Sequence, residues 1–312
     1  MRTTTYPRIA VWLGMVGLVV WALGGCGGGG GQKPSIHQDL QNARQEKDPM
    51  LRARKLMDIA LRQAKVQDLS GAETSLDEAA RACREVAEPD AKAGLLAKLA
   101  EKYFQIQRPR DARRILEEAR KTIDSIQQPE AKAKNLASLG RAQALMKDQE
   151  GAAQTLQAAE QAAGKIDDLK GRIEVLSDIA AAYHRNDQPS EADRVLQSAW
   201  TAIDRAEDAR LRSEALAQVA LSQSQLGKKA EAEKTFQQAL ETTSKLDDFF
   251  RRTNAMVEIA LKLSQAGLTD KAKEVLNEAE KLTPKIPQPD LQQQTLDRIR
   301  ETMDQIKLGK KK

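Results

Sequence analysis

Few side chains in this sequence have the types and spacings that catalysis or metal binding requires. Its two histidines, His37 and His184, are not paired with a cysteine or carboxylate at the spacing of metal ligands. Adjacent acids such as Asp167-Asp168 and Asp247-Asp248 fall at expected helix ends, where carboxylates cap backbone N–H groups. No Gly-x-Ser-x-Gly motif occurs, and no glycine-rich loop is followed by the Lys-Ser/Thr of a phosphate site. We therefore predict no catalytic, cofactor-binding or metal-binding residues, and a protein that is not an enzyme.

The elements that carry these side chains belong to a repeat of 40 residues, which occurs six times without insertion or deletion. The repeats begin at Leu51, Ala91, Ala131, Gly171, Leu211 and Arg251. Two alanine columns do not vary: Ala72, Ala112, Ala152, Ala192, Ala232 and Ala272, and Ala79, Ala119, Ala159, Ala199, Ala239 and Ala279. A fixed period of this size indicates a solenoid, in which each unit buries its apolar face against its neighbours.

Each repeat contains the pattern of two helices. In the repeat 171–210, apolar residues recur at helical spacing from Ile173 to Tyr183, and a second apolar stripe runs from Ala192 to Ala206. Proline stands in the first turn of several expected first helices, where it removes no hydrogen bond (Pro49, Pro89, Pro129 and Pro289). We predict an all-α protein: a right-handed α-solenoid of fourteen helices, with antiparallel pairs of about 15 residues per helix.

The ends of the repeat region predict caps. Residues 35–50 match the second helix of a truncated preceding unit and form an N-terminal capping half-repeat. Residues 51–290 hold the six repeats, and residues 291–312 supply a C-terminal capping helix and a basic tail. Solenoids need polar caps because an end unit has one face without a neighbour.

The repeats resemble those of the tetratricopeptide (TPR) family. The Ala-x3-Leu-x2-Ala of the second helix, as in Ala192, Leu196 and Ala199, is similar to that family's second-helix pattern. Leu139-Gly140 followed by Gln143, and Ile179-Ala180 followed by Tyr183, are similar to its Leu-Gly-x2-Tyr. The likeness covers about 240 residues, with a period of 40 in place of the family's usual 34.

This resemblance implies a concave groove lined by the first helices. There we expect an apolar patch from leucines and a valine near the C-terminal end and a charged middle. His184 is either a contact in the groove or an ordinary surface histidine. The candidate partner-binding residues are Met57, Leu61, Lys98, Glu101, Lys134, Arg141, His184, Leu221, Val257 and Leu261. The alternative is that the second helices fill this space and leave no open groove.

The N-terminus has the pattern of a secretory signal peptide. Two arginines precede an apolar run at residues 9–23, and Leu23-Gly24-Gly25-Cys26 follows. These four residues resemble the bacterial lipobox, which implies a signal peptide at residues 1–25, a lipid on Cys26 and a glycine-rich tether over residues 26–34. We expect a membrane-anchored lipoprotein of the bacterial cell envelope that faces the periplasm or the exterior. The alternative is an uncleaved N-terminal signal anchor, with Cys26 as a small residue beside the membrane.

The distribution of charge limits the kinds of partner that the sequence predicts, and the cysteine content indicates the role of Cys83. The formal charge is +5, but two arginines before the apolar run and four lysines from Lys307 onward account for all of this excess. A near-neutral body lacks the basic stripe of a nucleic-acid-binding protein, so we predict no nucleic-acid partner. Cys83, the only other cysteine, falls on the inner face of a helix and is expected to be a buried small hydrophobe.

Two functional hypotheses follow. The first is a membrane-tethered protein–protein interaction scaffold or adaptor that binds a protein, as a peptide or helix, in its groove. The second is a structural spacer or self-associating envelope protein without a peptide ligand. Neither hypothesis requires a cofactor.

Overall fold

The computed structural model describes residues 35–309, which form fourteen α-helices and one 3-10 helix, with no strand in that range. The helices are α1 (Ile36–Arg44), α2 (Pro49–Lys65), α3 (Leu69–Glu85), α4 (Pro89–Gln105), α5 (Pro109–Asp124), α6 (Pro129–Leu145), α7 (Gln149–Ala163), α8 (Leu169–Arg185), α9 (Pro189–Asp204), α10 (Ala209–Gln225), α11 (Lys229–Thr243), α12 (Phe249–Gln265), α13 (Thr269–Leu282), η1 (Thr283–Lys285) and α14 (Pro289–Gly309). The predicted signal peptide, Cys26, the glycine-rich tether and the last three lysines lie outside the described residues. No helix between residues 35 and 309 is both long enough and apolar enough to span a bilayer.

The helix starts follow the period of the sequence. The first helices α2 to α12 each contain 17 residues, and their starts lie 40 residues apart from Pro49 to Phe249. Proline at the first helical position, or an aspartate that caps the N-terminus, explains these boundaries. Asp48 accepts a hydrogen bond from Met50 N at 2.8 Å, and Asp248 accepts one from Arg251 N at 2.9 Å. The predicted helix pairs are therefore confirmed.

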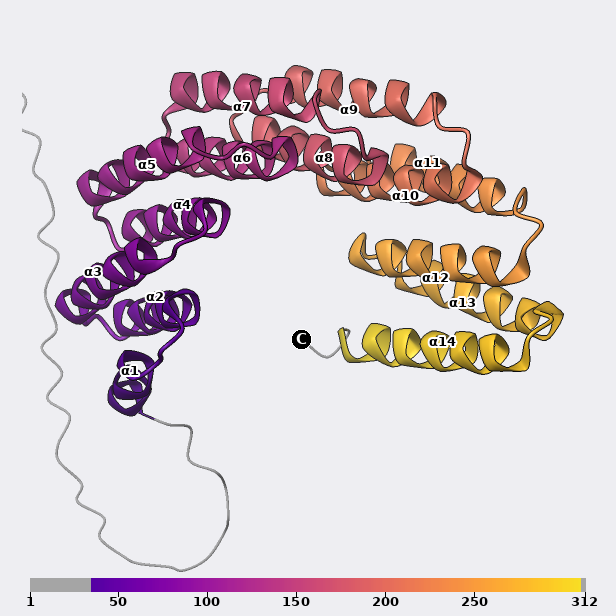
Figure 1. Cartoon of the computed structure of the whole chain (residues 1–312), viewed down its shortest axis with the longest axis horizontal. Helices are drawn as coiled ribbons and strands as arrows, with labels where there is room; N and C mark the ends of the chain where they lie inside the picture. Colours follow the sequence, from indigo (N-terminus) through magenta and orange to yellow (C-terminus); the bar gives the residue numbers. More distant parts are fainter. Residues whose placement is uncertain (1–34, 310–312) are drawn as a thin grey trace, which may run out of the picture. The chain divides into compact units, whose positions relative to one another are not determined.

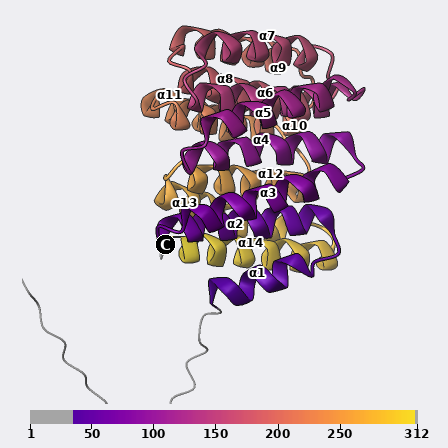
Figure 2. The same cartoon turned by 90° about the vertical axis from the view of Figure 1, so that its left-hand side faces the viewer.

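The helix pairs form two layers. The first helices α2 to α14 pack in order along one another, and the second helices α3 to α13 pack on the first helices of their own unit and of the next. Within the helical unit that begins at Ile36, the row of pairs curves with the first helices on its inner side (Figure 1). Figure 2 shows the same stacking after a quarter turn. We call the first helices the inner layer and the second helices the outer layer. The all-α solenoid is confirmed, while its right-handedness stays a prediction.

The core lies between these layers and runs through all six repeats. Every alanine of the two invariant columns is at most 1% exposed, because small side chains let paired helices approach closely. Cys83 is fully buried, and burial raises the pKa of its thiol to about 12. It is therefore the inert small hydrophobe that we predicted.

Each inner helix of the six repeats is followed, two residues after its last helical residue, by a residue of positive φ. These residues are Gln67, Gln107, Lys147, Asp187, Gly227 and Gly267. The next residue donates its N–H back to the last turn, as Lys228 N does to Gln223 O at 2.9 Å. This is the hydrogen bond of a Schellman cap, which the left-handed conformation makes possible.

These caps generate a stability prediction. Gly227→Ala lowers the free energy of unfolding by about 1 kcal/mol, because the left-handed conformation disfavours a Cβ. The added Cβ meets no atom within 4 Å, so the change reports backbone conformation alone. Gly164→Ala is the matched control: it lies at the end of α7 with φ −60°, and it should stabilise by about 0.4–1 kcal/mol. Urea unfolding followed by circular dichroism checks both variants, and shifts in the same direction would contradict this account.

Candidate functional site

The inner surface places the predicted groove residues in two groups. Lys98 and His184 are exposed, and Leu61, Glu101, Lys134, Arg141 and Leu261 are partly exposed. His184 makes no side-chain hydrogen bond or ion pair within residues 35–309. In the same range, no cluster of three metal-ligating side chains occurs.

Three predicted groove residues are buried instead. Met57 is 4% exposed, Leu221 is 5% exposed and Val257 is fully buried, and all three belong to the core. The prediction that they line an open surface is wrong. Their positions face the neighbouring helix because the inner helices pack closely along one another. The predicted apolar patch is thus reduced to Leu261, with Leu61 at the other end of the array.

The predicted charged middle of the surface exists, and Glu101, Lys134 and Arg141 are in ion pairs there, whereas Lys98 is not. Arg141 on α6 donates to Glu101 on α4 at 3.2 Å. Lys134, about two helical turns before Arg141, contacts Glu130 at 2.6 Å and Glu174 of α8 at 3.9 Å. These ion pairs connect three consecutive inner helices, so most of this charge serves the array itself.

Asp178 on α8 is an exception, because its carboxylate has no ion-pair partner in the described part of the chain. The side chain is exposed, yet the surrounding inner helices displace part of its water, and this desolvation raises its pKa. The nearby Glu174 carboxylate raises the pKa further, while Arg141 and Lys134 lower it. The ionised form of the Asp178 carboxyl is therefore less stable in the folded protein than in water.

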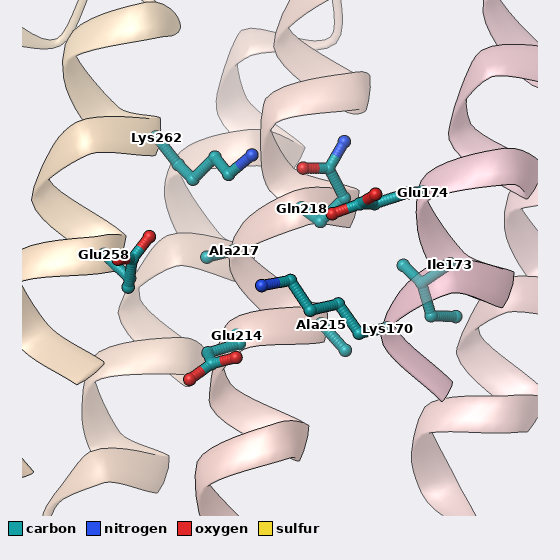
Figure 3. Close-up of a pocket in the computed structure, with 9 residues that line it drawn as sticks. All are labelled: Lys170, Ile173, Glu174, Glu214, Ala215, Ala217, Gln218, Glu258 and Lys262. Carbon is teal, nitrogen blue, oxygen red and sulfur yellow. The ribbon is translucent and has the colours of Figure 1, made fainter. Parts of the chain in front are cut away.

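A hollow lies on the inner surface beside α10, between α8 and α12 (Figure 3). Its volume is about 80 Å³. Its lining consists of Lys170, Ile173, Glu174, Glu214, Ala215, Ala217, Gln218, Glu258 and Lys262. Alanine and isoleucine therefore supply an apolar base, and charged side chains surround it.

The acids that line this hollow have basic partners outside it, whereas its two lysines have no acidic partner in the described part of the chain. Glu214 is paired with Arg210 at 2.9 Å, and Glu258 is paired with Arg298. Lys170 and Lys262 have no acid within ion-pair distance among the described residues. Figure 3 shows both ammonium groups extending from opposite sides toward the middle of the hollow. The third acid, Glu174, lies 3.9 Å from Lys134, which is closer to Glu130. The ammonium groups of Lys170 and Lys262 are without an ion-pair partner within residues 35–309 and can donate hydrogen bonds to an anionic group of a ligand.

Sequence reasoning missed these two lysines. Lys170 stands four residues before Glu174, and Lys262 stands four residues after Glu258, which is the spacing of an intrahelical ion pair. In the structure, both acids contact basic residues of neighbouring inner helices. A single sequence does not show that Glu174 and Glu258 contact Lys134 and Arg298 of neighbouring helices instead of the lysines of their own helices.

No protein-family model matches the sequence, and no curated protein does. Several solved structures are similar. A protein from Thermococcus onnurineus matches with 13% identity and a TM-score of 0.41, over 83% of this chain and 94% of that chain. Nearly identical TPR-like repeats of a putative kinesin light chain from Podosopora anserina match with 17% identity and a TM-score of 0.40, over 64% and 98%. A Rap protein complexed with competence and sporulation factor matches with 12% identity and a TM-score of 0.36, over 86% and 79%. Because these three TM-scores are all below 0.5, the similarities add no argument, and the fold is assigned from the helices of this chain.

The environment of Asp178 generates a pH-dependent prediction. A carboxyl whose pKa is raised by folding destabilises the protein once the unfolded chain ionises, above pH ~4. Asp178→Asn should therefore raise the free energy of unfolding at pH 7 by a few tenths of a kcal/mol, a small value because the side chain is exposed. The gain should disappear as the pH falls below the pKa that this carboxyl has in the unfolded chain. Asp58→Asn, at the same position of the first repeat, is the control. Thermal unfolding at pH 3 and pH 7 measures both, and a gain that persists at pH 3 would contradict the argument.

Proposed function

We propose that this protein is a membrane-tethered interaction scaffold of the bacterial cell envelope, and that it binds a protein partner on its inner surface. The observation that carries the proposal is the hollow, into which two lysines without an ion-pair partner among residues 35–309 extend. The occupant that fits is a peptide or helix segment with an acidic side chain, since a carboxylate can accept hydrogen bonds from both ammonium groups.

The proposed tether is supported by the N-terminal sequence. The apolar run and the Leu23-Gly24-Gly25-Cys26 motif favour lipidation of Cys26 after removal of residues 1–25. The tether would hold the scaffold at a membrane, where local concentration aids encounters with envelope proteins. The spacer or self-associating protein remains the competing function.

Site-specific photocrosslinking in cells that express the full chain tests this function. A photoreactive residue replaces Gln218 on the inner helix α10 or, as a control, Gln237 on the outer helix α11. We expect the Gln218 position to crosslink to one envelope protein and the Gln237 position not to. A crosslink only to a second copy of the chain would favour self-association, and equal patterns at both positions would contradict a binding surface on the inner side.

Charge reversal gives the quantitative prediction. Lys170→Glu/Lys262→Glu should reduce the crosslink from the Gln218 position at least tenfold, because it puts two carboxylates where the ligand carboxylate binds, and tenfold corresponds to about 1.4 kcal/mol. Lys121→Glu/Lys234→Glu reverses two lysines of the outer layer and should leave the yield unchanged. Circular dichroism should show the same helix content for both variants. Retention of the crosslink in the inner-surface variant would contradict the proposed role of the hollow.

A further inference from the structure

Ion pairs join successive helices of the outer layer, with a single interruption. Between residues 35 and 309, such pairs connect α1 with α3, α3 with α5, α7 with α9, α9 with the N-cap residue of α11, and α11 with α13. In this order the pairs are Arg44–Glu78, Arg84–Glu118, Arg194–Glu160, Lys228–Asp193 and Lys271–Glu233. In the same range, no ion pair or side-chain hydrogen bond connects α5 with α7. The outer layer is therefore interrupted at this junction, which lies over the inner helix α6.

The residue types at the junction explain the interruption. Across the preceding junction, the guanidinium of Arg84 donates two hydrogen bonds to Glu118, at 2.9 and 2.8 Å. The residues 40 positions later are Asp124 on α5 and Ala158 on α7. An aspartate and an alanine cannot form an ion pair, so this connection is missing between α5 and α7.

A second position for an ion pair is also unused here. Arg108 pairs with Glu73 across the preceding junction, and the residues 40 positions later are Asp148 and Arg113. Their charges are opposite, yet no ion pair joins them in the described part of the chain. Asp148 instead accepts a hydrogen bond from Gly151 N at 3.1 Å and caps α7.

The outer helix α7 also buries little apolar surface against its neighbours. Leu156 is its one large apolar side chain in the core, and its other buried residues are four alanines and Thr155. The outer helices on both sides bury three larger aliphatic side chains each: Ile115, Leu116 and Ile123 on α5, and Val195, Leu196 and Ile203 on α9. Since hydrophobic stabilisation scales with the apolar area buried, α7 is held less firmly than α5 or α9.

The polar contacts between α6 and α7 are incomplete as well. In the first repeat, the hydroxyl of Ser75 donates to Gln63 Oε1 at 2.7 Å. At the equivalent positions of the third repeat, Gln143 Oε1 and Thr155 Oγ1 are buried without a hydrogen-bond partner. Separation of α7 from α6 would expose both atoms to water, which supplies the missing hydrogen bonds. These two atoms therefore favour a looser α7.

On its other side, α7 is connected to the fourth repeat. The hydroxyl of Tyr183 donates to Glu160 Oε1 at 2.7 Å, and Asn186 Nδ2 donates to Gln149 O at 3.0 Å. Arg194 of α9 also pairs with Glu160. When α7 moves relative to α5, it therefore moves together with α8 and α9.

The inner layer is continuous where the outer layer is interrupted. Arg141 of α6 donates to Glu101 of α4 at 3.2 Å, and Asn135 Nδ2 of α6 donates to Asp90 of α4 at 2.6 Å. Asn135 is only 4% exposed, so its contact is shielded from water. The junction between the second and third repeats is thus fastened on its inner side alone.

We propose that the array has a hinge at this junction, where the distance between α5 and α7 varies while α4 and α6 stay packed. A fixed inner contact beside a variable outer gap produces a rotation of one segment against the next. The first two repeats thereby change their angle to the hollow on α8, α10 and α12, and the inner surface widens or narrows. The hinge depends neither on a lipid at Cys26 nor on the ligand of the proposed function.

Spin labels on the full chain in detergent measure this variation. Glu117→Cys/Gln157→Cys places two labels on exposed positions of α5 and α7, and Gln197→Cys/Gln237→Cys places them at the equivalent positions of α9 and α11. Double electron–electron resonance gives the distribution of the distance between the labels. We expect the distribution for positions 117 and 157 to be roughly twofold wider than that for positions 197 and 237, because only the second pair spans a junction with an ion pair.

The native thiols do not interfere with this measurement. Cys26→Ser removes one of them in every variant, and Cys83 does not react because it is fully buried. Circular dichroism should show the same helix content for all variants. Equal widths for the two label pairs would overturn the proposal.

A restored ion pair tests the cause of the variation. Asp124→Arg/Ala158→Glu recreates the Arg84–Glu118 arrangement between α5 and α7, and should narrow the distribution for positions 117 and 157 by about 1.5-fold. Salt at 0.5 M should widen it again, because screening weakens exposed ion pairs. Asp124→Arg/Ala158→Arg changes the same positions without creating a pair, and should not narrow the distribution. Equal narrowing by both variants, or narrowing by neither, would overturn the hinge as proposed.

Discussion

The structure depends on close approach between helices across alanine. Both invariant columns are buried on the outer helices, and any larger side chain there would separate the two layers. Gly140 illustrates how little space remains, since a Cβ on it would lie 2.7 Å from Leu156 Cδ2. Close approach lets short aliphatic residues fill the core and lets consecutive inner helices pack along one another. The same packing decides which inner-surface residues are available to a partner.

Ion pairs connect successive helices in both layers. Arg141–Glu101 at 3.2 Å links inner helices, and Arg44–Glu78 at 2.6 Å and Arg84–Glu118 at 2.8 Å link outer helices. Ion pairs of this kind at a surface contribute about 0–1 kcal/mol each. The order of the helices is therefore set by the core, and the outer ion pairs adjust spacing rather than determine the fold.

The sequence predicted the fold in detail and the site only in part. Helix starts at Pro49 and Pro89 follow from residue types whose conformational preferences are local. Burial of Leu221 could not be predicted, because it depends on how closely neighbouring helices approach. One inner-helix position alternates between glutamine and tyrosine over the first four repeats, as Gln63, Tyr103, Gln143 and Tyr183. In the structure the hydroxyl of Ser75 donates to buried Gln63 at 2.7 Å, whereas the hydroxyl of Tyr103 donates to Asp77.

Each helix of the array makes its substantial contacts only with the helices of its own unit or an adjacent one. No pairing fixes the distance between α2 and α14 directly, so that distance is the accumulated result of rotations at successive interfaces. Gain or loss of one whole unit of 40 residues would leave every other interface intact. The length of this protein is thus adjustable in discrete steps, and a gene duplication that respects the period changes its reach without redesigning its core.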